Sequence, residues 1–214
     1  PLILQANTLY TWLMNPIQRV MPEGSLLIAT AVTTPFTVPL KLSLVVSVFI
    51  TVPFLLYHAW SFVRPALFPQ EQQTLRYAIM LSILLFFAGA SFAYFIICPL
   101  ALHFLLHMAP VGVTTMTDIG HYLDFILSLT LAFGLAFQTP LITWTILRVG
   151  LVSVDTLKEK RALVIVMAFV LGMLLTPPDV LSQVCLALPL WGLYELGLLL
   201  FQMTHRVNTA SGHP

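Results

Sequence analysis

Five long apolar stretches constrain the fold of this chain more than any other feature of its sequence. A bilayer core about 30 Å thick is crossed by about 20 helical residues, and a small water-facing domain cannot bury five such stretches. Apolar residues make up 59% of the 214 and charged residues only 8%. The sequence therefore predicts an all-α polytopic membrane protein. The predicted helices cover Leu40–Trp60, Tyr77–Leu106, Tyr122–Leu147, Ala162–Leu175 and Val180–Met203.

Two of these stretches differ in length from a simple span. Tyr77–Leu106 would form a helix roughly 45 Å long at about 1.5 Å per residue, so we expect it to tilt, to project from the membrane, or to bend at Pro99. Ala162–Leu175 would reach only about 21 Å, which is too short for an unperturbed bilayer. We expect local thinning of the membrane there, or a partner that covers the gap.

The distribution of lysine and arginine predicts how the chain is oriented. Short loops rich in these residues stay in the cytoplasm. Only Arg19 and Lys41 fall on the other side, so the segment before Leu40 is predicted to be external and the C-terminus cytoplasmic. The formal net charge of +1 gives no reason to expect a nucleic-acid partner. The seven residues predicted to share the cytoplasmic side are Arg64, Arg76, Arg148, Lys158, Lys160, Arg161 and Arg206.

The sequence divides into three regions. Residues 1–39 are expected to form an external cap, with a short interfacial helix from Leu9 to Val20 and an extended segment from Leu26 to Val38. Residues 40–206 are expected to form the membrane bundle, and residues 207–214 a disordered cytoplasmic tail. The opening Pro1-Leu2-Ile3-Leu4 reads as the end of a further hydrophobic segment.

Two polar residues inside apolar stretches need an explanation. Gln138 stands ten residues before Arg148, which places it about 15 Å deep, on a face shared with Thr130 and Gly134. It can form a hydrogen bond within one bundle, or it can serve a subunit contact or a substrate path. For Glu195 we expect snorkelling to the cytoplasmic surface or pairing with Arg206.

No residue pattern points to catalysis or to a cofactor. The sequence has no phosphate loop, nucleophile elbow or metalloprotease helix, so ATP hydrolysis is not expected. His103 and His107, with Asp118 and His121 further along, have a spacing compatible with a metal, but interfacial histidines explain them more simply. We expect no metal site. Cys98 and Cys185 fall in apolar stretches and are read as small buried hydrophobes.

The predicted loop after Trp60 is the most informative surface. It reads Phe62-Val63-Arg64-Pro65-Ala66-Leu67-Phe68-Pro69-Gln70-Glu71, and its two prolines stiffen it. Glu71 is the only acidic residue in it. Its charge suits the N-terminus of the next helix, or a receptor for a cationic ligand.

These residues resemble TatC, the polytopic subunit of the twin-arginine protein translocase. The resemblance runs from about Asn7 to Phe201 and implies a six-helix fold with both termini in the cytoplasm and the last two helices short. Five of those helices are complete here, and the chain begins past most of the first. Where the family often has Glu in its fourth helix, this chain has Gln138. The matching motifs are Phe62–Glu71, Ala90–Phe95 with Pro99-Leu100, Ala132–Gly134 through Phe137 and Pro140, and Gly172–Asp179.

The resemblance implies a receptor in a bacterial inner membrane, not an enzyme. It would bind twin-arginine signal peptides through Glu71, Phe62 and Pro65, and recruit single-helix TatA and TatB partners for export of folded proteins driven by the proton-motive force. Gln138, Met173, Leu174 and Thr176 are the expected partner-helix contacts, and Pro177, Pro178 and Asp179 form an external loop. Further copies of the chain are expected in the complex. The alternative is a small-solute or ion-coupled permease, which would need Gln138 and Glu195 to line its substrate path.

Overall fold

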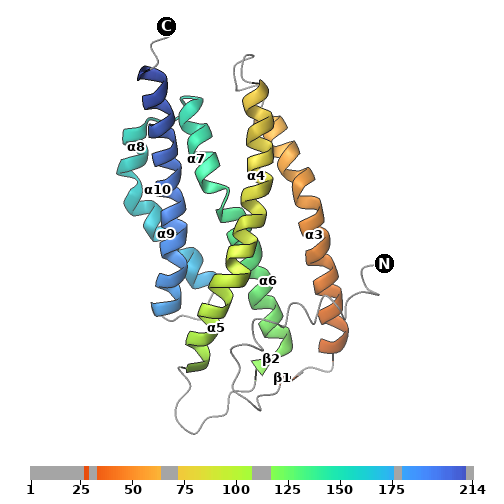
Figure 1. Ribbon diagram of the computed structural model, residues 1–214. Helices are drawn as coiled ribbons and strands as arrows, with labels where there is room; N and C mark the ends of the chain where they lie inside the picture. The colour runs from red at the N-terminus through yellow and green to blue at the C-terminus, as the bar shows by residue number, and fades with distance from the viewer. Residues whose placement is uncertain (1–26, 29–32, 64–71, 108–116, 176–179, 211–214) are drawn as a thin grey trace.

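The structure, a computed structural model, describes residues 27–28, 33–63, 72–107, 117–175 and 180–210. Its helices stand side by side in an elongated array (Figure 1). Within the described residues four spans are long and apolar enough to cross a membrane, and Arg161–Leu175 is a shorter apolar helix. The four spans are Phe36–Ser61, Arg76–Phe104, Ile119–Arg148 and Gln183–Thr204. The prediction of a polytopic α-helical membrane protein is therefore confirmed. The elements are β1 (Leu27–Ile28), α3 (Thr34–Val63), α4 (Gln72–Phe92), the π-helix η4 (Ala93–Ile97), α5 (Cys98–His107), β2 (Thr117–Asp118), α6 (Ile119–Ala136), α7 (Thr139–Arg148), α8 (Val154–Glu159), α9 (Arg161–Leu175) and α10 (Val180–Ala210).

The long second span is irregular one turn before its proline. The π-helix η4 separates α4 from α5, and the Cys98 N–H donates to the carbonyl of Ala93 instead of to the residue four positions back. Pro99 has no N–H to donate and its ring crowds the carbonyl four residues earlier, so a wider turn relieves the strain there. A bend at Pro99 is one of the alternatives that the sequence leaves open, and the structure has an irregular turn at residues 93–97, just before this proline.

The third span also consists of two helices. α6 ends at Ala136 and α7 begins at Thr139, with Pro140 in its first turn, where a missing N–H is tolerated. α7 ends at Arg148 and is followed by Gly150, whose φ of +76° suits glycine. The break therefore falls beside Gln138, about two thirds of the way along the span Ile119–Arg148.

Close helix crossings at glycines hold the array together. α4 packs on α6, and α10 packs on both α7 and α9. A Cβ on Gly89 would lie 2.6 Å from the carbonyl oxygen of Phe133, and one on Gly197 would lie 2.9 Å from the Cα of Pro140. The largest buried cluster joins α3, η4, α5, α6 and α10, and includes Tyr94, Cys98, Tyr122, Phe133 and Leu186.

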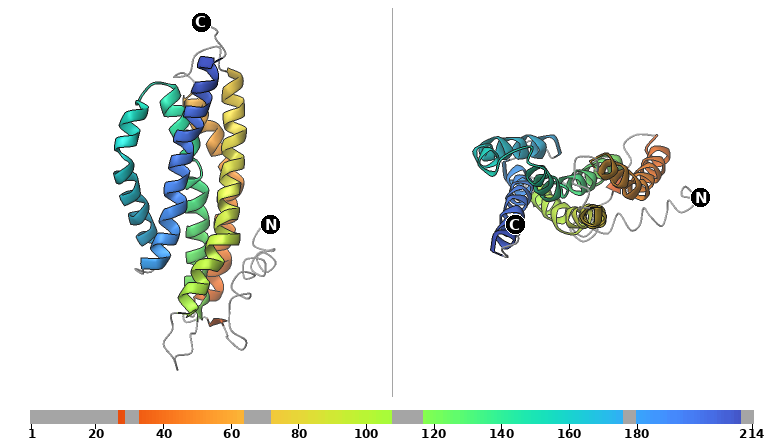
Figure 2. Two further views of the ribbon diagram at one scale, coloured as in Figure 1. Left: turned by 60° about the vertical axis from the view of Figure 1, so that its left-hand side comes forward. Right: turned by 90° about the horizontal axis from the view of Figure 1, so that it is seen from above.

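The views in Figure 2 show how these contacts arrange the helices: α3 lies at one edge, α9 and α10 lie at the other, and α4, α6 and α7 lie between them. The small parallel strand pair joins residue 27 to 117 and residue 28 to 118 at the end where α5 finishes and α6 begins. The opposite end carries the last turn of α3, the first turn of α4, the end of α7, and α8. We call this the cationic end, because Arg76, Arg148, Lys158, Lys160 and Arg161 belong to these elements or follow them directly.

Three expectations about boundaries need correction. The predicted extended segment from Leu26 to Val38 is wrong from Thr34 onward, where α3 begins, whereas Leu27–Ile28 is a strand. Pro35 suits a first helical turn, and the apolar residues after it continue the span, so the preference of threonine for extended backbone is overridden.

At the other terminus α10 continues to Ala210, past the predicted start of a disordered tail at residue 207. Of the last two membrane helices, which were both expected to be short, α9 is short with 15 residues, whereas α10 has 31 and contains a span of 22. The expected interfacial helix from Leu9 to Val20 lies outside the described residues.

Candidate functional site

Gln138 lies inside the bundle and is bonded to α4. Its side chain is only 6% exposed, and Ser82, its neighbour on α4, is fully buried. The Gln138 Nε2 donates to the backbone oxygen of Ser82 at 2.9 Å, and its Oε1 accepts from the Ser82 Oγ at 2.5 Å. The structure thus realises the internal hydrogen bond that was one of the two alternatives for Gln138. The sequence alone identified Gln138 as a polar residue inside a span, but it did not indicate Ser82 as its partner.

Gln138 also borders a small groove on the face between α3, α4 and α7. The groove has a volume of about 340 Å³, and Leu56, Trp60, Ser82 and Ile142 line it with Gln138. Contact between a partner helix and Gln138 stays a prediction, and this groove is the surface on which it would occur.

The second polar residue, Glu195, is paired with α9. Its Oε2 accepts from the Arg161 Nη2 at 2.7 Å, a partner that the sequence did not indicate. The side chain of Arg206, the partner expected from the sequence, lies outside the described side chains. Glu195 is 21% exposed, and its other oxygen is buried without a hydrogen-bond partner among the described residues. Next to it, the Tyr194 hydroxyl donates to the Leu157 carbonyl at 2.8 Å. The turn between α8 and α9 is therefore fixed to α10, a long-range pairing that sequence spacing does not reveal.

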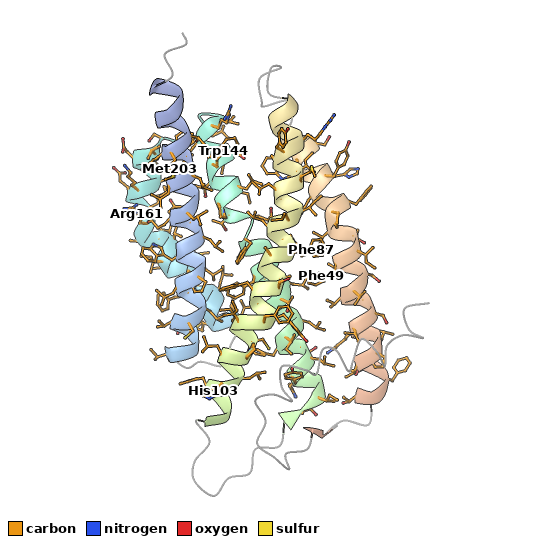
Figure 3. All side chains as sticks on the ribbon, in the orientation of Figure 1. Phe49, Phe87, His103, Trp144, Arg161 and Met203 are labelled. Atoms are coloured by element: carbon orange, nitrogen blue, oxygen red, sulfur yellow. The ribbon has the colours of Figure 1, made fainter. Side chains whose placement is uncertain are left out.

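Short-range interactions also shape the cationic end. The Arg148 guanidinium lies 4.9 Å above the Trp144 ring, and Lys158 lies 3.7 Å from Asp155 within α8. The Ser153 Oγ caps α8 by accepting from the Thr156 N–H. Figure 3 shows Trp144, Arg161 and Met203 in this half of the molecule and His103 at the far end.

The predicted signal-peptide residues lie next to this end along the chain. Phe62 belongs to the last turn of α3, and its side chain is not described. Pro65 and Glu71 lie outside the described residues, between Val63 at the end of α3 and Gln72 at the start of α4. Both flanking helix ends are at the cationic end (Figure 1).

Most of the apolar surface of α9 is uncovered. Of its residues only Ala168 and Gly172 are buried, whereas Met173 is 52% and Leu174 is 73% exposed. The inner side of α9 is held by Gln183, whose Nε2 donates to the Phe169 carbonyl at 2.9 Å. Gln183 was missed at the sequence level, although a glutamine inside an apolar stretch was the available signal. Thr176, Pro177, Pro178 and Asp179 lie outside the described residues.

Asp118 acts as a helix cap. Its Oδ1 accepts from the backbone N–H groups of Gly120 and His121 at the start of α6, and lies 3.2 Å from the His121 Nδ1. Within the described residues no three His, Cys, Asp or Glu side chains come together as a metal site. Cys98, which is buried, and Cys185 are both free thiols.

These features define the class of the protein: a multi-pass membrane protein in which the short apolar helix α9 is largely exposed and one end of the helical array is cationic. Residues 2–189 match the family model "Sec-independent protein translocase protein (TatC)". The chain belongs to the TatC family and is a component of the twin-arginine translocase.

Named relatives and solved structures agree with this assignment. TatC of Haemophilus influenzae is 47% identical over 202 residues, covering 92% of this chain and 77% of that protein. TatC of Escherichia coli K12 is 43% identical over 197 residues, covering 92% and 76%. A crystal structure of the "Twin Arginine Translocase Receptor" TatC superposes with a TM-score of 0.85 at 37% identity, covering 94% of this chain and 88% of that one.

Proposed function

We propose that this chain is the signal-peptide receptor of a twin-arginine translocase, with the receptor surface at its cationic end facing the cytoplasm. The observation that carries the proposal is the family membership. It is supported by the place of residues 64–71 in the chain, between the end of α3 and the start of α4, which both lie at the cationic end. The excess of lysine and arginine at this end supports a cytoplasmic location, and the strand-bearing end would then be external. A bacterial inner membrane is the corresponding location.

Glu71 supplies the recognition chemistry in this proposal. A carboxylate accepts two parallel hydrogen bonds from the planar fork of an arginine, whereas lysine presents a single point charge. An acidic residue in a connection otherwise rich in proline and apolar residues would therefore select arginine over lysine. Phe62 and Pro65 would provide the apolar surroundings of the peptide.

Single-helix partners are proposed to pack on α9. Its 15 residues reach about 22 Å, which falls short of a bilayer core of about 30 Å, and its outward side chains are large and apolar. A TatA-like or TatB-like helix beside Met173, Leu174 and Thr176 would cover this mismatch. The loop of Pro177, Pro178 and Asp179 would lie at the external end of that contact.

A permease is less well supported. It would require Gln138 and Glu195 to line a substrate path, but Gln138 is bonded to Ser82 and Glu195 to Arg161. The family is one of translocase receptor subunits, so we propose binding, and not catalysis, as the activity.

The test is a comparison of two signal peptides. Membranes containing the chain together with its translocase partners are incubated with a photo-crosslinking twin-arginine peptide or its twin-lysine counterpart. The proposal predicts strong labelling of the chain by the first peptide and weak labelling by the second. Equal labelling by both peptides would contradict it.

A further inference from the structure

A long apolar groove lies on the face of the bundle where α4 and α10 flank α7. Its volume is about 920 Å³, and all three helices contribute to its walls. In the right-hand view of Figure 2, α4 and α10 both lie on one face of α7 and are separated from each other across it. Many of its side chains are exposed in the isolated chain, so the groove is open to lipid or to another membrane-embedded segment. Representative wall residues are Leu81, Leu84, Leu141, Leu193, Leu196 and Leu200.

The groove is about one leaflet deep. On α4 it runs from Tyr77 at the cationic end to Ala88, and the eleven helical steps between these residues correspond to about 16 Å. Half of a bilayer core measures about 15 Å. Along the third span it reaches past the start of α7 to Phe137, in the break between α6 and α7. A partner helix that crosses the whole membrane would need a contact surface about twice as long as this groove. An acyl chain from one leaflet has a length that matches the groove.

The open end of the groove is polar, aromatic and cationic. Tyr77, Trp144 and Thr204 line it, and the Trp144 Nε1 donates to the Thr204 Oγ1 at 3.3 Å. Tryptophan and tyrosine are typical of the depth of lipid headgroups. The Arg148 guanidinium lies 4.9 Å from the centre of the Trp144 ring, so a positive charge lies next to this wall residue, and the exposed Arg76 directly precedes Tyr77; neither arginine lines the groove itself.

We propose that this groove binds an anionic phospholipid from the leaflet at the cationic end. Its acyl chains lie along α7 between α4 and α10, and its phosphate is held near Arg148 beside Trp144. Basic residues at the mouth of a gap between membrane helices favour anionic headgroups over zwitterionic ones. The inference does not depend on the receptor role, since it rests only on the groove and its opening.

The test measures lipid binding directly. The delipidated chain in detergent is titrated with phosphatidylglycerol or with phosphatidylcholine of the same acyl chains, and bound lipid is counted by native mass spectrometry. We expect one phosphatidylglycerol to be retained with about fivefold preference over phosphatidylcholine. Arg148→Gln should remove this preference and Arg148→Lys should keep most of it. Lys158→Gln, which removes a charge from the same end but away from the groove, should leave it unchanged.

A second pair of variants tests the groove itself. Leu196→Trp fills the groove and should lower the retention of both lipids severalfold, whereas Leu55→Trp, on an exposed part of α3 outside this groove, should not. The proposal is overturned if the wild type shows no preference for phosphatidylglycerol, or if Arg148→Gln and Lys158→Gln have the same lipid preference. It is likewise overturned if Leu196→Trp and Leu55→Trp retain the same amount of lipid. It is also overturned if Leu196→Trp lowers crosslinking to a single-helix partner without changing lipid retention.

Discussion

At the scale of single residues, Gln138 and Ser82 show why a polar side chain is tolerated inside a span. Hydrocarbon offers no hydrogen bonds, so each polar group must find a partner within protein. Gln138 bonds both the hydroxyl and the backbone carbonyl of one residue on the neighbouring helix. The pair connects α4 to the break between α6 and α7.

Removing the Ser82 hydroxyl should therefore destabilise the bundle modestly. Ser82→Ala is expected to cost about 0.6 to 1.7 kcal/mol, the range of single interhelical hydrogen bonds in membranes. Gln138→Leu should lower the cost of adding Ser82→Ala, because the partner is already gone. Unfolding in mixed micelles gives the free energies. Fully additive losses in the double variant would contradict the coupling.

At the scale of whole elements, helix contacts depend on a few glycines. Gly89 and Gly134 bring α4 and α6 together, and a Cβ on Gly134 would lie 2.7 Å from the Phe86 ring. Gly192, in α10, has nothing within 4 Å of such a Cβ. Gly89 is therefore required for a close helix crossing, whereas the space around Gly192 can hold a larger side chain.

This difference predicts opposite effects of alanine. Gly89→Ala should destabilise the fold by about 1 to 3 kcal/mol, because its Cβ meets the rigid carbonyl of Phe133. Gly192→Ala should be neutral or stabilising by up to about 1 kcal/mol, since alanine favours the helix. Thermal unfolding in detergent compares the two. The crossing described here is wrong if Gly89→Ala is as stable as wild type.

The short helix α9 makes a prediction about partners. A photo-crosslinker at Leu174 should capture a single-helix partner in active membranes, because this residue is exposed near the C-terminal end of α9. The same probe at Leu129, which is buried in α6, serves as the control and should capture none. Failure of position 174 to capture any TatA-like or TatB-like protein would remove α9 as the partner surface.

At the scale of the whole molecule, the positions of the helices follow from hydropathy and from the charged residues and prolines that flank the apolar stretches. All five apolar stretches became helices, and the short one at Ala162–Leu175 was recognised by its flanking Arg161 and Pro177. Pairings between distant residues were not predictable, because side-chain contact depends on packing: Arg161 with Glu195 is the clearest case. The start of α3 at Thr34 was missed because local preference for extended backbone yields to the membrane.

The orientation of the molecule remains a prediction, and labelling can check it. In a variant without Cys98 and Cys185, a cysteine at Lys158 should react with an impermeant reagent only from the cytoplasm, and one at Asp179 only from outside. The two positions lie at opposite ends of α9 along the chain. Reversed accessibility would invert the proposed receptor face.

The role of Glu71 is the centre of the functional account, and two explanations of this carboxylate give different results. As a receptor it should lose about 1.5 to 3 kcal/mol of peptide binding on Glu71→Gln, which is roughly a ten- to hundredfold weaker affinity. As a charge at the start of α4 it should lose about 0.3 to 1 kcal/mol of stability and leave the affinity almost unchanged.

The most direct measurement is a titration of a twin-arginine peptide against wild-type and Glu71→Gln translocase complexes of equal stability. Glu159→Gln is a suitable control, since this exposed carboxylate lies at the same end, in α8. The account predicts that Glu71→Gln binds the peptide at least tenfold more weakly than wild type and that Glu159→Gln binds it as well as wild type. Equal affinities of wild type and Glu71→Gln would contradict it.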